Sequence, residues 1–177
     1  EMMNLGGDER IYPASMTKIM TALLTIENLP DLNETITVPE DIFEELTAQD
    51  ASVAGFNPYE QPTVRDLLYG VLLPSGADAC ETLARAVGGS EEGFVAMMNQ
   101  KAEELGLTNT HFENCTGLHN DNHYSTCRDI AVLMSECLKS DTFREIVTRE
   151  VYTTEATASH PEGITLYDTM LHRFTSY

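Results

Sequence analysis

The chain has 177 residues, of which 42% are hydrophobic and 7 are proline, and this composition is typical of a globular protein with a buried core. Its formal net charge of −19 argues against nucleic-acid binding, which needs clustered lysine and arginine, and disfavours a basic membrane-surface role. No apolar run approaches the roughly 20 residues of a membrane-spanning helix.

Helical signals dominate the first part of the chain. The apolar segment 15–28 (SMTKIMTALLTIEN) predicts a helix that Pro30 ends. Residues 36–38 (ITV) predict a short strand, and an irregular stretch follows through Gln61. Start signals and apolar spacing then predict further helices over 63–72, 76–88, 90–105, 126–138 and 140–149.

The remaining segments are loops and extended chain. Residues 107–125 form a long polar loop, and ordered loops of this length are often functional. Residues 151–157 are predicted to be extended, and 166–174 fit no single element. The acidic pairs Glu91-Glu92 and Glu103-Glu104 are typical of solvated helix faces.

The four cysteines form no C-x-x-C pair, which disfavours a zinc ribbon or a thioredoxin motif. Cys80 and Cys137 lie on apolar helix faces and are expected to be buried. Cys115 and Cys127 bracket the polar loop, and their spacing leaves open both a disulfide and two free thiols.

A serine and a lysine three residues apart begin the first predicted helix. Ser15 and Lys18 therefore share one helix face, with Ser15 near the helix N-terminus, where unpaired N–H groups can stabilise a developing oxyanion. The lysine must be uncharged to accept the serine proton, and burial in an apolar helix disfavours its charged form. The competing interpretation makes Ser15 a helix cap and Lys18 a solvent-reaching side chain.

A second serine, Ser75, lies in the Pro-Ser-Gly break between two predicted helices. Its hydroxyl there can point into a cleft, or it can cap the helix over 76–88. The two segments PASMTK (13–18) and PSGADA (74–79) resemble the S-x-x-K and S-x-N elements of penicillin-recognising serine enzymes. The closer resemblance, which extends over residues 11–139, is to serine-type D-alanyl-D-alanine carboxypeptidases, the low-molecular-weight penicillin-binding proteins.

The resemblance implies roles for three residues. Ser15 would be the acylated nucleophile, Lys18 its general base, and Ser75 the hydroxyl that relays a proton to the leaving D-alanine. The backbone N–H of Ser15 would form half of an oxyanion hole. Substrates would be peptidoglycan stem peptides ending in D-Ala-D-Ala, β-lactam antibiotics would acylate the same serine, and no cofactor or metal is implied.

The sequence departs from the family pattern at two points. Ala77 occupies the position of the asparagine of S-x-N, and no K-T-G occurs in the 177 residues. We therefore expect 1–177 to be a partial catalytic domain that is inactive alone, with N-terminal strands and the K-T-G strand absent. The parent fold would be α/β, with helices on an antiparallel sheet, whereas this chain would be predominantly helical with the sheet largely missing.

Two further functions remain as alternatives. A serine β-lactamase needs a glutamate that activates the deacylating water, and its E-x-x-L-N pattern does not occur. A non-catalytic penicillin-binding or wall-sensing module is the other. His119 and His123 are four residues apart, a spacing that zinc ligands can have, but they lie in a loop, where this spacing does not align their rings. We therefore interpret this segment as a solvated polar loop and not as the site of a zinc peptidase. The family resemblance implies an extracytoplasmic location, with membrane contact only through a segment that this chain lacks.

Overall fold

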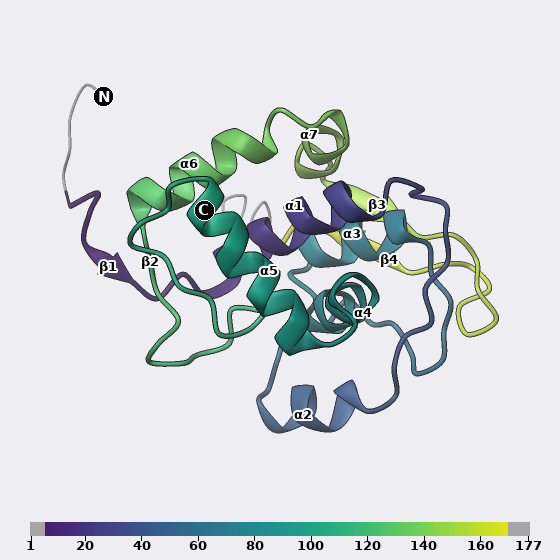
Figure 1. Cartoon of the computed structure of the whole chain (residues 1–177). Coiled ribbons are helices and arrows are strands. Elements are labelled where there is room, and N and C mark those ends of the chain that lie inside the picture. Colours follow the sequence, from purple (N-terminus) through teal and green to yellow (C-terminus); the bar gives the residue numbers. More distant parts are fainter. Residues whose placement is uncertain (1–5, 170–177) are drawn as a thin grey trace, which may run out of the picture.

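A computed structural model describes residues 6–169 of the chain, and within them helices form most of the regular structure (Figure 1). The predicted predominance of helix over sheet is confirmed. In chain order the elements are β1 (Arg10–Ile11), the 3₁₀ helix η1 (Ala14–Thr17), α1 (Lys18–Asn28), α2 (Ile42–Ala48), α3 (Val64–Leu72), α4 (Ala77–Gly88), α5 (Glu91–Glu104), β2 (Ser125–Thr126), α6 (Cys127–Cys137), α7 (Asp141–Val147), β3 (Val151–Thr153) and β4 (Thr165–Tyr167).

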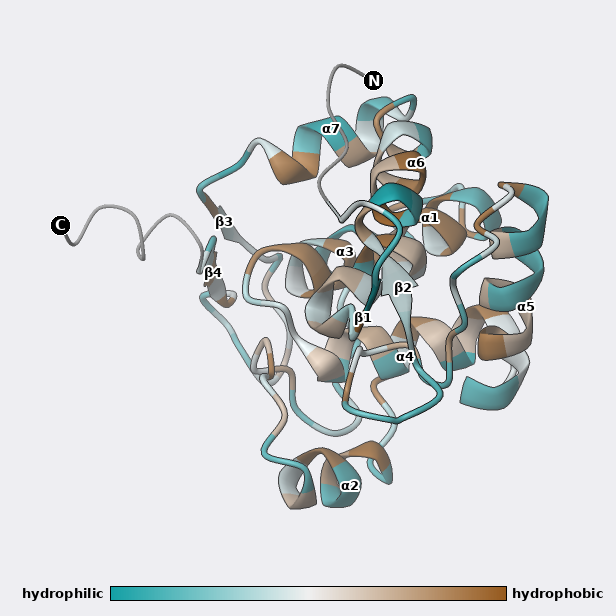
Figure 2. Ribbon diagram, turned by 90° about the vertical axis from the view of Figure 1, so that its left-hand side faces the viewer, coloured by the Kyte–Doolittle hydropathy of each residue, from teal (hydrophilic) through white to brown (hydrophobic). Residues whose placement is uncertain are grey.

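Helix α1 is the centre of the molecule and contacts α3, α4, α5, α6 and α7. Its apolar side chains Met20, Leu23 and Leu24 are buried among them. Figure 2 shows the same organisation by hydropathy. The central helices α1, α3 and α4 are mostly hydrophobic or neutral (brown and white), whereas the peripheral α5 carries broad hydrophilic (teal) segments. Burial of this apolar surface, at about 25 cal/mol per Å², is the main force that places α1 in the core.

Local capping interactions fix the predicted helix starts. Thr63 and Asp66 form a reciprocal capping box at the start of α3, and the side chains of Ser90 and Thr126 accept backbone N–H groups at the starts of α5 and α6. Each such cap is worth about 1 kcal/mol. These starts agree with the prediction because each cap and its partner lie three residues apart.

Two sequence predictions between residues 30 and 61 are wrong. Residues 36–38 form no strand, although the N–H groups of Ile36 and Val38 donate to the carbonyls of Pro62 and Glu60. The stretch expected to be irregular contains helix α2, which buries only Ile42 and Leu46 and therefore has a weak apolar pattern.

Sheet structure in the described residues is limited to two antiparallel pairs, β1 with β2 and β3 with β4. The two-residue strands β1 and β2 were not predicted, because two residues carry no periodicity. Within the same residues no helix has the length and apolar character needed to cross a membrane. The uncertain segment 166–174 begins in β4, and its last five residues lie outside the described part.

The open question about Cys115 and Cys127 is answered by their positions. Both are free, with Cys115 buried and Cys127 exposed at the start of α6. Cys80 and Cys137 are buried in the core, as predicted.

Candidate active site

Ser15 lies in η1, a single 3₁₀ turn that leads into α1. Pro13 precedes the turn, and its carbonyl accepts the N–H of Met16 at 3.1 Å. Ala14 has a φ of 48°, a left-handed value that costs a residue with a side chain free energy. This turn places the Ser15 side chain at the surface, immediately before the buried helix.

Lys18 is the first residue of α1 and is only 5% exposed. Its Nζ donates a hydrogen bond to the backbone oxygen of Thr116 at 2.5 Å. The interpretation in which Lys18 reaches solvent is therefore wrong. Thr116 was not singled out by the sequence, because a backbone carbonyl 98 residues away leaves no pattern.

Ser75 approaches Ser15 from the break between α3 and α4. Its Oγ donates a hydrogen bond to Ser15 Oγ at 2.9 Å. Ser75 has a φ of 63°, and it does not cap α4, whose N-cap residue is Gly76 without a side-chain bond. The alternative in which Ser75 is a helix cap is therefore excluded.

Gly76 is required at this break by the space around it. A Cβ added there would lie 2.7 Å from both the backbone nitrogen of Ala54 and Asp78 Oδ1. The Gly76 N–H donates to the carbonyl of Gly70 at 2.8 Å, and the next N–H, of Ala77, donates to Ser52 at 2.7 Å. These bonds hold the left-handed Ser75 in place.

Asp78, in the first turn of α4, fixes the loop beside the site. It is fully buried, and its carboxylate accepts the backbone N–H groups of Ala54, Gly55 and Phe56 at 2.7, 2.9 and 3.0 Å. Asp78 was not singled out from the sequence. The signal that could have identified it is its place as an acidic residue in the first turn of an apolar helix.

The three predicted residues line one cavity of about 590 Å³. Ser15, Lys18 and Ser75 share it with apolar side chains that include Val71 and Phe143. A smaller cavity of about 160 Å³ is also lined by Ser15 and Lys18, together with Ala77 and Thr116. The structure therefore joins the two hydroxyls of the prediction by a hydrogen bond and places Lys18 in the lining of the same cavity.

The loop that carries Thr116 is fastened to η1 and α1 at several points. Thr21 Oγ1 donates to the carbonyl of Cys115 at 2.7 Å. Gly117 has a φ of 85°, and a Cβ there would lie 1.9 Å from the carbonyl oxygen of Ala14, so only glycine permits this approach. Contacts at Cys115 and Gly117, the residues on either side of Thr116, therefore fix the carbonyl that accepts the Lys18 hydrogen bond.

The two loop histidines do not converge. His119 is 67% exposed at its side chain and pairs with Asp121, whereas His123 is 2% exposed. His123 Nδ1 accepts the backbone N–H of Glu113 at 3.0 Å, and Nε2 lies 2.7 Å from Thr17 Oγ1. Burial lowers the pKa of His123 to about 4. The expectation of a solvated polar loop is therefore wrong at His123, which is buried and joins the loop to η1.

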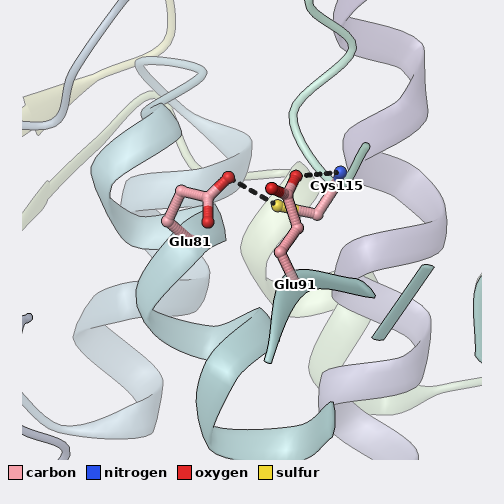
Figure 3. A group of neighbouring side chains, drawn as sticks. All are labelled: Glu81, Glu91 and Cys115. Atoms are coloured by element: carbon pink, nitrogen blue, oxygen red, sulfur yellow. Dashed lines mark hydrogen bonds between the residues drawn. The ribbon is translucent and has the colours of Figure 1, made fainter. Parts of the chain in front are cut away.

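A separate group of side chains has the composition of a metal site. Ligand atoms of Glu81, Glu91 and Cys115 lie within 4.8 Å of one another. Figure 3 shows both carboxyl groups directed at Cys115. The expectation that Glu91 and Glu92 form a solvated face holds for exposed Glu92, whereas Glu91 is half-buried in this group.

Comparisons with known proteins agree in one family. The family model described as D-alanyl-D-alanine carboxypeptidase matches residues 2–169. The D-alanyl-D-alanine carboxypeptidase DacF of Bacillus subtilis is 40% identical over 157 residues, which cover 88% of this chain and 40% of the relative. The D-alanyl-D-alanine carboxypeptidase of Streptomyces sp. strain K15 is 38% identical over 154 residues, 82% of this chain and 53% of that protein.

Solved structures show the same similarity in three dimensions. The Streptomyces K15 DD-transpeptidase superposes with a TM-score of 0.87 at 33% identity, over 98% of this chain and 71% of that one. Penicillin-binding protein 6B from Escherichia coli has a TM-score of 0.83 at 28% identity, over 93% of this chain and 52% of that one. The chain therefore has the fold that the sequence resemblance implied.

Proposed function

The chain belongs to the D-alanyl-D-alanine carboxypeptidase family, and on that premise we propose that it removes the terminal D-alanine from peptidoglycan stem peptides. Ser15 is the nucleophile, Lys18 the general base and Ser75 the proton relay. The hydrogen bond between Ser75 and Ser15, in the cavity that Lys18 also lines, is the observation that supports this proposal.

Acylation begins when Ser15 Oγ attacks the carbonyl carbon of the penultimate D-alanine. The proposed step requires Lys18 to be uncharged: its amine donates one N–H to the Thr116 carbonyl and accepts the Ser15 proton on its lone pair. The bond that Ser75 donates to Ser15 Oγ strengthens as negative charge develops on that oxygen.

Ser75 then completes the step by passing its proton to the nitrogen of the leaving D-alanine while it accepts a proton from Lys18, so that the proton taken from Ser15 is relayed and the Lys18 amine is uncharged again. The peptide bond breaks, and the substrate remains attached to Ser15 as an ester. Water attacks this ester in the second half of the reaction, which releases the shortened peptide and restores the Ser15 hydroxyl.

A β-lactam reacts at the same serine, because its strained amide presents a carbonyl to the same nucleophile. Since the substrate is a cell-wall polymer, the proposed reaction takes place outside the cytoplasm. Ala77 lines the cavity beside Lys18 and brings no side-chain amide to the substrate.

Labelling with a fluorescent penicillin tests the proposal in the full-length gene product, together with an assay for released D-alanine. We expect a stable label that is absent from Ser15→Ala, and D-alanine release from a D-Ala-D-Ala peptide. Rapid loss of the label would indicate a β-lactamase instead. A folded protein without label or D-alanine release would indicate a non-catalytic module and overturn the proposal.

A further inference from the structure

We infer that His123 positions the nucleophile Ser15 for the proposed acylation, by holding the turn η1 in register with the loop that carries Thr116. This inference rests on the proposed function. His123 is a positioning residue in this role, because its ring nitrogens bind Thr17 and the backbone of Glu113, and neither of the reacting hydroxyls.

The first step of the argument is that η1 needs a side-chain anchor. Its first three residues are exposed, and the left-handed conformation of Ala14 costs free energy. Thr17, its last residue, is fully buried. Apart from the bond between Ser75 and Ser15, the bond between His123 and Thr17 is the only side-chain hydrogen bond that η1 makes within residues 6–169. The placement of the turn therefore depends on Thr17.

The second step is the direction of this hydrogen bond. A backbone N–H can only donate, and the N–H of Glu113 lies 3.0 Å from His123 Nδ1, so Nδ1 accepts and carries no proton. The neutral ring then has its proton on Nε2, which donates to Thr17 Oγ1 at 2.7 Å. The backbone of the loop thus selects the form of the ring that can hold Thr17.

The same two bonds exclude His123 as the general base for Ser15. The lone pair of Nδ1 is directed at the Glu113 N–H, and Nε2 already carries its proton, so no free lone pair remains to accept a proton. The ring is 2% exposed and packs edge-on against Phe112, with the ring centroids 5.6 Å apart. A histidine close to the nucleophile therefore acts here through position and not through proton transfer.

The third step is the loop side of the ring. Glu113 lies three residues before Thr116, whose carbonyl accepts the Lys18 amine at 2.5 Å. One imidazole therefore connects the turn that carries Ser15 with the loop that carries the acceptor of the proposed base. Without the bond to Thr17, the turn can shift relative to Lys18, and a misplacement of about 1 Å can cost roughly 10²-fold in rate.

Two amide variants separate the two bonds of the ring. The side chain of His123→Gln is long enough to bring an amide N–H to Thr17 in place of Nε2. The side chain of His123→Asn can accept the Glu113 N–H in place of Nδ1 but is too short to reach Thr17. A role of the ring in packing alone would not favour glutamine over asparagine.

The test measures acylation of the full-length gene product by a fluorescent penicillin, at several concentrations, so that the limiting rate constant and the dissociation constant of the initial complex are separated. We expect the rate constant to fall roughly 10–100-fold in His123→Asn and by less than about threefold in His123→Gln, with the dissociation constant unchanged. His111→Asn, at a half-exposed histidine of the same loop, is the matched control and should keep the wild-type rate. Equal rate constants in the two His123 variants overturn the inference.

The Thr17 side of the bond is tested separately, which also covers the case that a His123 variant does not fold. Thr17→Val keeps the shape of the side chain without its hydroxyl and is expected to acylate as slowly as His123→Asn, whereas Thr17→Ser is expected to stay near the wild-type rate. Thr25→Val is the matched control, because it removes a buried hydroxyl of α1 that donates to the Thr21 carbonyl at 2.8 Å. Acylation of Thr17→Val at the wild-type rate overturns the inference.

A second readout is independent of enzyme activity. In protein with ¹⁵N-labelled histidine rings, the His123 resonances are assigned by their loss in His123→Gln. At neutral pH we expect a ring proton on Nε2, with a resonance that shifts in Thr17→Val and not in Thr25→Val. If the protein is not acylated at all, the proposed function fails, and these resonances alone decide the inference. A proton on Nδ1, or an Nε2–H resonance that is insensitive to Thr17→Val, overturns it.

Discussion

The Ser75 hydroxyl donates a hydrogen bond to the Ser15 hydroxyl at 2.9 Å, across 60 residues of sequence. Ser75 itself has a left-handed backbone conformation, with a φ of 63°, and Ser15 directly follows the left-handed Ala14, with a φ of 48°. Such conformations cost about 1–3 kcal/mol each and persist where the surrounding structure enforces them. The two left-handed residues therefore lower the stability of the folded chain, while they hold the two hydroxyls together at the surface end of a buried helix.

Replacement of Ser75 by alanine is expected to slow acylation of Ser15 by roughly 10²–10⁴-fold, because the variant loses both the stabilising hydrogen bond and the proton relay. The rate of labelling by a fluorescent penicillin measures this effect. Ser90→Ala is a matched control, since it removes the N-cap of α5 and is expected to lower stability by about 1 kcal/mol without slowing acylation. Equal rates in Ser75→Ala and wild type would contradict the relay.

Lys18→Met is expected to abolish acylation, because no amine remains to accept the Ser15 proton. The carbonyl of Thr116 loses its partner, which costs about 1–3 kcal/mol of unfolding free energy in urea titrations. Lys18→Arg is not expected to restore activity, since a guanidinium stays charged. Lys139→Met, which removes the exposed lysine paired with Glu136, is the matched control and should keep full activity. Acylation of Lys18→Met at the wild-type rate would remove Lys18 from the mechanism.

Stability is expected to fall as the pH is lowered from about 6.5 to about 4, in part because of His123. Burial lowers the pKa of His123 to about 4 in the folded chain, whereas an unfolded histidine titrates near 6.5. Between these values the unfolded state binds the extra proton, so the folded state is disfavoured as pH falls, by about 2–3 kcal/mol in total. The effect is absent above pH 6.5.

Urea titrations at pH 7 and pH 4.5 measure this dependence. His123→Gln cannot bind the proton and is expected to lose less stability than wild type between the two pH values. His119→Gln removes an exposed histidine and is expected to behave as wild type. If the two variants show the same pH dependence, His123 does not link folding to protonation.

Asp78→Asn is expected to destabilise the protein by roughly 2–4 kcal/mol, because an asparagine offers one acceptor oxygen where the carboxylate oxygens bind three N–H groups of residues 54–56. Thermal unfolding measures the loss. Asp141→Asn, at an exposed position in the first turn of α7, is the matched control and is expected to change stability by less than about 0.5 kcal/mol. A similar stability for Asp78→Asn and wild type would show that the loop is held by other contacts.

Much of the fold could be predicted from short-range patterns. The caps at Thr63, Ser90 and Thr126 lie three residues from their partners. Each of these helix starts can therefore be recognised from residues within a single helical turn. Helix α2 and the β1–β2 pair could not be found in this way. The first has too few apolar positions, and the second joins residues 10–11 to 125–126.

The candidate site shows the same division. The residues Ser15, Lys18 and Ser75 could be proposed from two short motifs, and their placement around one cavity agrees with that proposal. Their roles remain a proposal. Thr116, which accepts the Lys18 amine, and Asp78, which holds the loop beside the site, were not recognised because each contact joins distant segments.

The sequence by itself determined the helices other than α2 and indicated Ser15, Lys18 and Ser75, since helix signals and the two short motifs each involve residues that are close together in the chain. Only the tertiary structure decided that Lys18 is buried against the carbonyl of Thr116, and that Glu81 and Glu91 meet at Cys115. The physical reason is that these contacts form between α1, α4, α5 and the 107–124 loop, and their geometry depends on how the whole core packs.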